Sequence, residues 1–110
     1  MIENTITKIE NQIRSISSLN DSKKEELGAL LATLKEEVVS LAETESDRAE
    51  SIARFTELST HEATREAGSD RLKALSVEGL SASVDGFEAS HPRLVQIVNN
   101  FCTTLANLGI

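Results

Sequence analysis

The chain has 110 residues, enough for one small domain. It has no Trp or Tyr and only three Phe, so aliphatic side chains must supply most of the buried area, at about 25 cal/mol per Å². A net charge of −7 argues against nucleic acid and against an anionic membrane surface as partners.

Helix is the secondary structure expected throughout. Proline occurs once, glycine is absent between Ala29 and Ala67, and no segment alternates polar and apolar residues as a strand does. Ala, Leu, Glu, Lys and Ser dominate, and these residues favour helices. We therefore predict an all-α fold, a small helical bundle that oligomerisation completes, with one domain over residues 1–110. It comprises an N-terminal helical hairpin (1–43), a polar middle helix (44–70) and C-terminal helices (71–110).

The first helix is expected over about residues 3–18, because isoleucines recur along it at spacings of four, three, four and three. This heptad stripe is typical of a coiled coil, and isoleucine at every core position favours three or four parallel strands. An ordinary amphipathic helix that packs on its own neighbour explains the stripe equally well. The stripe consists of Ile2, Ile6, Ile9, Ile13 and Ile16.

A turn is expected at residues 17–21. The second helix is predicted to begin at Ser22, which has Glu25 three residues later in the capping-box pattern. Two apolar stripes joined by a short turn predict an antiparallel helical hairpin. The second stripe consists of Leu27, Leu31, Leu34, Val38 and Leu41.

The segment 44–70 contains few large apolar side chains. Either the second helix runs straight through it, or a new helix begins at Ser46. In both cases we expect this helix to be the most solvated part of the chain, projecting from the bundle or covering one side of it. Gly68 is expected to end the helix, and Ser69 or Asp70 to cap the next one.

The last third carries an apolar stripe that keeps its register across Pro92. Either Pro92 starts a new helix capped by Ser90 or His91, or it kinks one long helix. We favour a new helix, because the residue before a proline avoids the helical region. Gly109 is expected to end this last helix. The stripe consists of Val77, Leu80, Val84, Phe87, His91, Leu94, Val98, Phe101, Leu105 and Leu108.

Two further patterns concern packing in this last third. Small residues recur at helical spacing and favour the close approach of another backbone; the alternative is that Gly86 and Ser90 only weaken the helix before a turn. The small residues are Gly79, Ser83, Gly86 and Ser90. The 17 residues from Leu94 to Ile110 carry no charged side chain. An unpaired charge in a crowded groove costs several kcal/mol, so we expect this helix to lie in a core or a subunit contact.

The closing block, F-E-A-S-H-P-R-L leading to T-L-A-N-L-G-I, resembles the end of a small bacterial family described only as a domain of unknown function. Members of that family open with a helical hairpin, and this chain is longer than a typical member around residues 44–70. The resemblance implies no activity. The positions that carry it are Phe87, Glu88, Ser90, His91, Pro92, Leu94, Gly109 and Ile110.

Few residues point to chemistry. His91 is expected to bridge a helix junction, although Glu88 and His91 have the Glu-x-x-His spacing of carboxylate-bridged metal proteins. Glu57 and His61 stand four residues apart, a spacing more typical of a solvated surface than of a metal site. Cys102 lies beside the apolar stripe and is expected to be a buried small hydrophobe. We expect no enzymatic activity, cofactor or metal.

These patterns favour a cytoplasmic, non-enzymatic scaffold that associates with itself, most simply as a dimer. One alternative is a regulatory subunit that docks a helix on one larger protein, and a second is a metal or catalytic site around Glu88 and His91. No nucleic acid or membrane partner is expected. The structural hinge is predicted at Ser90, His91 and Pro92. The residues expected at the interface are Ile6, Ile9, Ile13, Leu94, Val98, Phe101 and Leu105.

Overall fold

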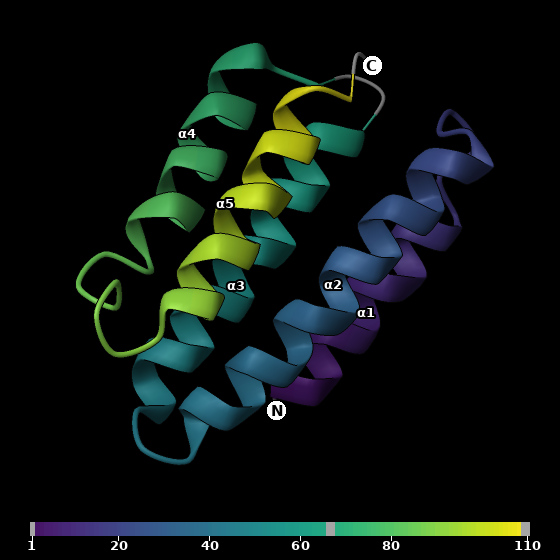
Figure 1. Cartoon of the computed structure of the whole chain (residues 1–110). Coiled ribbons are helices and arrows are strands. Elements are labelled where there is room, and N and C mark those ends of the chain that lie inside the picture. The colour runs from purple at the N-terminus through teal and green to yellow at the C-terminus, as the bar shows by residue number, and fades with distance from the viewer. Residues whose placement is uncertain (1, 66–67, 109–110) are drawn as a thin grey trace.

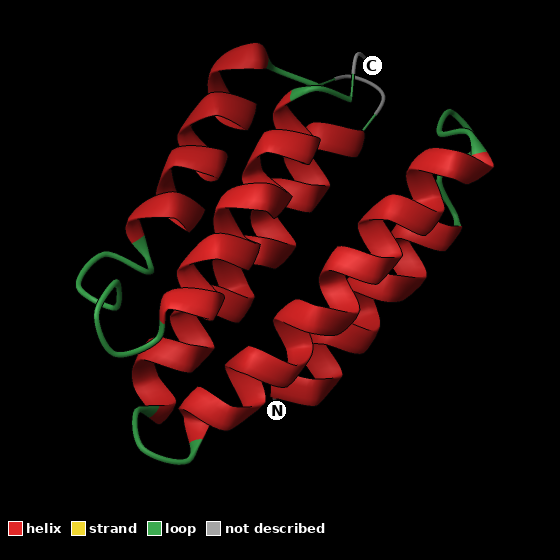
Figure 2. Ribbon diagram, in the orientation of Figure 1, coloured by secondary structure: helices red, strands yellow, loops and turns green. Residues whose placement is uncertain are grey.

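A computed structural model describes residues 2–65 and 68–108 (Figure 1). These residues contain helices and loops without any strand (Figure 2). The all-α fold and the small bundle are therefore confirmed. In the described parts of the chain the helices are α1 (Ile2–Arg14), α2 (Asp21–Ala42), α3 (Ser46–Thr64), α4 (Asp70–Ala82) and α5 (Pro92–Ala106).

The predicted N-terminal hairpin is present, with α1 and α2 running antiparallel side by side (Figure 1). The expected helix over residues 3–18 is shorter, because α1 ends at Arg14. The cap of α2 is Asn20 and not Ser22: the Asn20 Oδ1 accepts a hydrogen bond of 2.8 Å from the backbone N–H of Lys23. Asparagine is an effective cap, and once it takes that role Ser22 falls inside the first turn.

The second and third helices are separate. Helix α2 ends at Ala42 and α3 begins at Ser46, so the reading with a new helix at Ser46 is the correct one. Glu45 occupies the capping position without a side-chain hydrogen bond. The chain reverses direction between the two helices, which places α3 against the rest of the bundle (Figure 1).

Helix α3 is central, so the expectation that it is the most solvated helix was wrong. It packs against each of the other helices and lies behind α5 in Figure 1. Its threonine hydroxyls donate to carbonyls four residues earlier, for example from Thr60 to Thr56 at 2.8 Å. A polar group satisfied within its own helix can be buried at low cost. The buried residues of α3 are Ala49, Ile52, Ala53, Thr56, Ser59, Thr60, Ala63 and Thr64.

Pro92 begins a new helix, as favoured from the sequence, and His91 is its cap residue without a side-chain capping bond. Ser69 caps α4 by accepting from the backbone N–H of Leu72 at 3.3 Å. Gly68 does not end α3 directly, because the cap position there is Arg65. The predicted terminator Gly109 lies outside the described residues.

The stripe of small residues has two different roles. At Gly79 the close neighbour is a side chain and not the predicted backbone: an added methyl group would lie 2.5 Å from Cε1 of Phe55 on α3. Gly86 instead makes a turn, because its backbone φ of +93° is one that residues other than glycine rarely adopt. An added methyl group at Gly86 would have no atom within 4 Å. Close packing thus belongs to Gly79, while Gly86 belongs to the loop between α4 and α5.

The apolar stripes of α1, α2 and α5 meet in one core, to which α3 and α4 also contribute. The isoleucine stripe of α1 packs inside its own chain, as an ordinary amphipathic helix does. The seven residues expected at a subunit interface are also in this core, each at most 3% exposed. They are therefore not open to a second copy at the surface of the folded chain. They are Ile6, Ile9, Ile13, Leu94, Val98, Phe101 and Leu105.

Candidate functional site

The loop between α4 and α5 holds the Phe87, Glu88, Ser90 and His91 positions of the closing motif, and it is built around the buried ring of Phe87. The guanidinium of Arg48, from the first turn of α3, lies 4.3 Å above the centre of this ring. Its Nη2 also donates to the carbonyls of Ser83 at 3.2 Å and Asp85 at 2.9 Å. Arg48 thereby joins the loop to α3 through one cation–π contact and two charged hydrogen bonds.

Glu88, Ser90 and His91 are engaged within the same loop. The Glu88 carboxylate accepts from the backbone N–H of Gly86 at 2.8 Å, and the His91 Nδ1 is 2.9 Å from the Ser90 Oγ. The His91 ring meets the Phe87 ring edge to face, with ring centroids 5.4 Å apart, and the backbone N–H of His91 donates to the Phe87 carbonyl at 2.8 Å. The structure thus places Ser90, His91 and Pro92 at a tightly bonded junction.

Replacing Arg48 by alanine is expected to lower the free energy of unfolding by about 1–3 kcal/mol, because two charged hydrogen bonds and an exposed cation–π contact are lost. The Arg48→Lys variant keeps the charge but lacks the planar guanidinium that lies over the Phe87 ring, so it should recover only part of the loss. Urea unfolding would measure both. Wild-type stability in the alanine variant would show that Arg48 does not hold the loop.

The other candidates for chemistry are separated from one another. The Lys8 Nζ pairs with the Glu57 carboxylate at 3.0 Å, and His61 is exposed one turn further along α3. Burial raises the pKa of the Cys102 thiol to about 11, so it stays protonated at neutral pH, and its Sγ lies 3.7 Å from the Val77 carbonyl. Among the described residues, no three His, Cys, Asp or Glu side chains are grouped so as to hold a metal ion.

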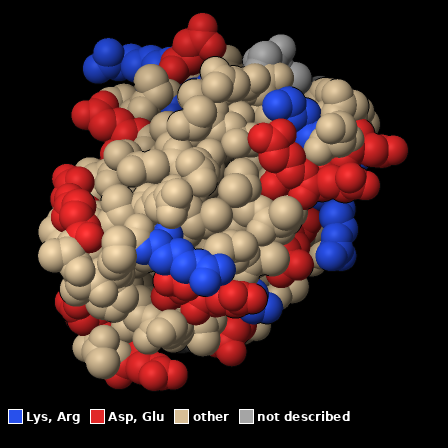
Figure 3. All heavy atoms as spheres, viewed as in Figure 1, with Lys and Arg blue, Asp and Glu red and all other residues tan. Residues whose placement is uncertain are grey.

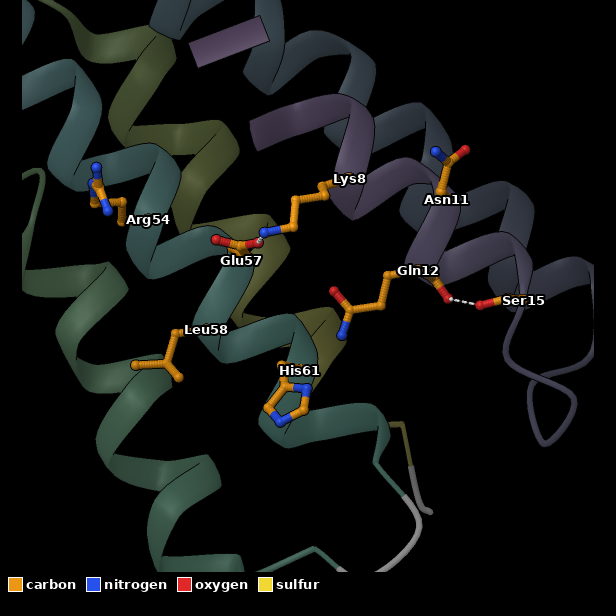
Figure 4. Close-up of a pocket in the computed structure, with 8 residues that line it drawn as sticks. All are labelled: Lys8, Asn11, Gln12, Ser15, Arg54, Glu57, Leu58 and His61. Carbon is orange, nitrogen blue, oxygen red and sulfur yellow. Dashed lines mark hydrogen bonds and ion pairs between the residues drawn. The ribbon is translucent and has the colours of Figure 1, made fainter. Parts of the chain in front are cut away.

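A groove of about 640 Å³ runs between α1 and α3, which are parallel (Figures 1 and 4). Both walls present residues at the spacing i, i+3, i+4, i+7, which is one face of a helix over two turns. The ionisable side chains other than His61 sum to +1, from two cations and one carboxylate. We call this feature the α1–α3 groove; its lining residues are Lys8, Asn11, Gln12, Ser15, Arg54, Glu57, Leu58 and His61.

Three leucines stand on the outer side of α3 and α4. Leu58, Leu72 and Leu75 are 46%, 45% and 49% exposed, and they are the exposed large hydrophobic side chains of the described chain. The contact of Phe55 with Gly79 sets the register of the two antiparallel helices. Leu58 follows Phe55 by three residues and Leu75 precedes Gly79 by four residues. Because the two helices are antiparallel, Leu58 and Leu75 lie at nearly the same height along the bundle axis, which we call their level. We call these three residues the leucine face; at Leu58 it adjoins the α1–α3 groove.

A second surface covers α4 and α5 and is nearly free of charge. Figure 3 shows an uncharged area in the upper middle of this side of the molecule, with charged side chains around it and below its centre. A shallow groove of about 500 Å³ separates the two helices there. After Pro92 and Arg93 in its first turn, the side chains that α5 exposes are Gln96, Asn99, Asn100, Thr103 and Ala106.

Sequence reasoning did not single out Leu72 or Leu75. Both are out of phase with the stripe of Val77, Leu80 and Val84, which the structure buries in whole or in part. That mismatch of phase is the signal that could have found them, because an apolar residue off the buried stripe of a helix must face solvent or a partner.

No helix in the described ranges is both long enough and apolar enough to cross a bilayer.

Comparison with curated proteins and with solved structures finds no match. A family model described as domain of unknown function (DUF4404) matches residues 56–110. The matched half contains the second part of α3, all of α4 and α5, and the motif loop. The resemblance seen in the closing block is thereby confirmed at the level of an uncharacterised domain family. Since the match covers half of its length, the chain belongs to the DUF4404 family, a domain of unknown function.

Proposed function

We propose that this protein is a non-enzymatic helical interaction protein that associates with itself, as a dimer, through the leucine face. The observation that carries the proposal is that Leu58, Leu72 and Leu75 remain nearly half exposed on two helices packed side by side, with Leu58 and Leu75 at nearly the same level. Clustered apolar side chains on a small domain are typical of interaction sites.

The energy available from this face suits a weak dimer. Fully burying a leucine yields about 1.5–3 kcal/mol, so completing the burial of six half-exposed leucines, three from each copy, yields roughly 4–8 kcal/mol. Association costs at least about 4 kcal/mol in lost translational and rotational freedom. The leucines alone therefore give a marginal balance, and a stable dimer needs further contacts beside them.

The charges near the leucine face favour a second copy as the occupant. The chain carries −7 overall, and charge of one sign would make two copies repel each other. Near the leucines, however, the Lys8–Glu57 and Arg54–Glu50 ion pairs are each neutral, and the exposed Arg71 and Glu78 of α4 carry opposite charges. A surface without net charge can meet a copy of itself, which the isologous interface of a twofold dimer requires.

The uncharged α4–α5 surface provides less driving force. Its exposed Asn, Gln and Thr side chains are well hydrated, and burying them yields little unless each finds a hydrogen-bond partner. The lone thiol of Cys102 suits a reducing compartment, so we place the protein in the cytoplasm.

The test is the mass of the purified chain by sedimentation equilibrium over a range of concentrations. We expect a shift with concentration from 11.9 kDa toward twice that value. Leu75→Glu should abolish the shift, because it places a carboxylate in the apolar contact. Ala32→Glu, which adds the same charge at an exposed position of α2, should leave it unchanged. A monomer at every concentration would contradict self-association and favour docking on a larger protein.

A further inference from the structure

We infer that the twofold axis of this dimer runs parallel to α3 and α4, so that Leu75 of each copy enters the α1–α3 groove of the other. This inference rests on the proposed self-association and specifies its geometry. It also supplies the additional contacts that the leucine face needs, because the groove adjoins the leucine face at Leu58.

Contacts within one chain set the levels of the residues along the bundle. Phe55 lies opposite Gly79, so Leu75 is nearly level with Leu58, and Glu78 is nearly level with Phe55 and its neighbour Arg54. The ion pair of Lys8 with Glu57 sets the level of α1 in the same way. Along the bundle axis, Glu78 therefore lies between the levels of Arg54 and of the Lys8–Glu57 pair.

A rotation by 180° about an axis parallel to the helices keeps every residue at its own level along the bundle. It places the α4 side of one copy opposite the α1 side of the other. Helix α4 of the partner copy then lies over the α1–α3 groove, antiparallel to α3, with its Leu75 beside Leu58. An axis perpendicular to the helices would instead place α4 on α4 of the partner copy. That arrangement leaves the groove uncovered and pairs Arg71 with Glu78 of the partner copy.

The charges of the groove fit the parallel axis. Its two cations reach into solvent: the side chain of Lys8 is 75% exposed and that of Arg54 is 68% exposed. Each is paired with a less exposed glutamate of its own chain, which leaves further donors free toward the open side of the groove. Glu78 of the partner copy arrives at their level and supplies a carboxylate.

The dimensions agree as well. Each wall of the groove spans seven residue steps, about 10 Å at the helical rise, whereas Leu72 and Leu75 are three steps or about 4.5 Å apart. Both leucines of the partner copy therefore lie within the length of the groove. Figure 4 shows Gln12 reaching from α1 toward His61, with Leu58 on the side of α3 that faces α4.

The test is a charge exchange measured by sedimentation equilibrium. Glu78→Arg and Arg54→Glu should each raise the dissociation constant of the dimer about tenfold, because each places like charges in contact. The Glu78→Arg/Arg54→Glu double variant should return it to within about threefold of wild type. Gln12→Trp, which fills the groove, should weaken the dimer as strongly as either single change.

The outcomes separate the two proposals. If wild type is a monomer, self-association itself fails. Suppose that Leu75→Glu abolishes the dimer, and that the Glu78→Arg variant is rescued by Arg71→Glu and not by Arg54→Glu. In that case α4 packs on α4 of the partner copy, so the groove geometry is wrong although self-association is correct. A dimer unaffected by both Arg54→Glu and Gln12→Trp overturns the groove geometry in the same way. Circular dichroism of each variant checks that these surface changes leave the fold intact.

Discussion

Replacing Phe101 by alanine is expected to lower the free energy of unfolding by about 3–5 kcal/mol, the cost typical of deleting a fully buried ring. Phe101 is 0% exposed and is the largest fully buried side chain described in this structure. A domain of this size is stable by only about 5–15 kcal/mol, so the variant loses a large share of its total stability. Urea unfolding followed by circular dichroism measures the loss.

Asn100 provides a matched control, since it is the preceding residue of the same helix and faces solvent. Asn100→Ala should change the free energy of unfolding by no more than about 0.5 kcal/mol, as other exposed substitutions do. Equal effects of the Asn100 and Phe101 changes would mean that the uncharged helix α5 is not packed in the core. The loss of unfolding free energy in Phe101→Leu should lie between those of the Asn100→Ala and Phe101→Ala variants, because leucine keeps most of the apolar volume.

A second large effect is expected at Gly79. Alanine is the better helix former by about 1 kcal/mol, yet Gly79→Ala should destabilise the protein by about 1–3 kcal/mol. The reason is steric: the new methyl group would lie 2.5 Å from Cε1 and 2.8 Å from Cδ1 of Phe55. Either the ring must turn or α3 and α4 must separate, and thermal or urea unfolding measures the cost.

Two comparisons isolate this cause. Gly28 is also inside a helix but has no atom within 4 Å of an added methyl group, so Gly28→Ala should stabilise the protein by about 0.5–1 kcal/mol. In a Phe55→Ala background the clash is absent, and Gly79→Ala should become neutral or stabilising. Destabilisation that persists in this background would show that the Phe55 contact is not the reason.

Local features of this chain were predictable because their causes lie in neighbouring residues. The hairpin follows from two apolar stripes of period 3.5 joined by a short turn. The start of α5 at Pro92 follows from the geometry of proline, which fits the first turn of a helix and restricts the residue before it. The same reasoning missed the cap of α2, because Asn20 and Ser22 are both good caps and only one can lie at the helix start.

The position of α3 could not be predicted, because its buried face is made of residues that are common on surfaces. Thr56, Thr60 and Thr64 resemble solvated residues until their hydroxyls are seen to donate to carbonyls of the same helix. Such hydroxyls need no outside partner, and small side chains allow neighbouring helices to approach closely. Whether a helix of this composition lies at the centre or at the edge depends on what packs around it.

By itself, the sequence determined that this protein is all helix, where its apolar stripes run and how its last helix begins, because periodicity and proline geometry act within a few residues. Only the tertiary structure decided which stripes meet. The side chains of Ile9 and Phe101 could have faced another copy, since an apolar stripe has the same pattern for either partner. The bundle buried them inside one chain and left Leu58, Leu72 and Leu75 outside. Burial depends on contacts between residues far apart in the sequence, and a helical period does not encode them.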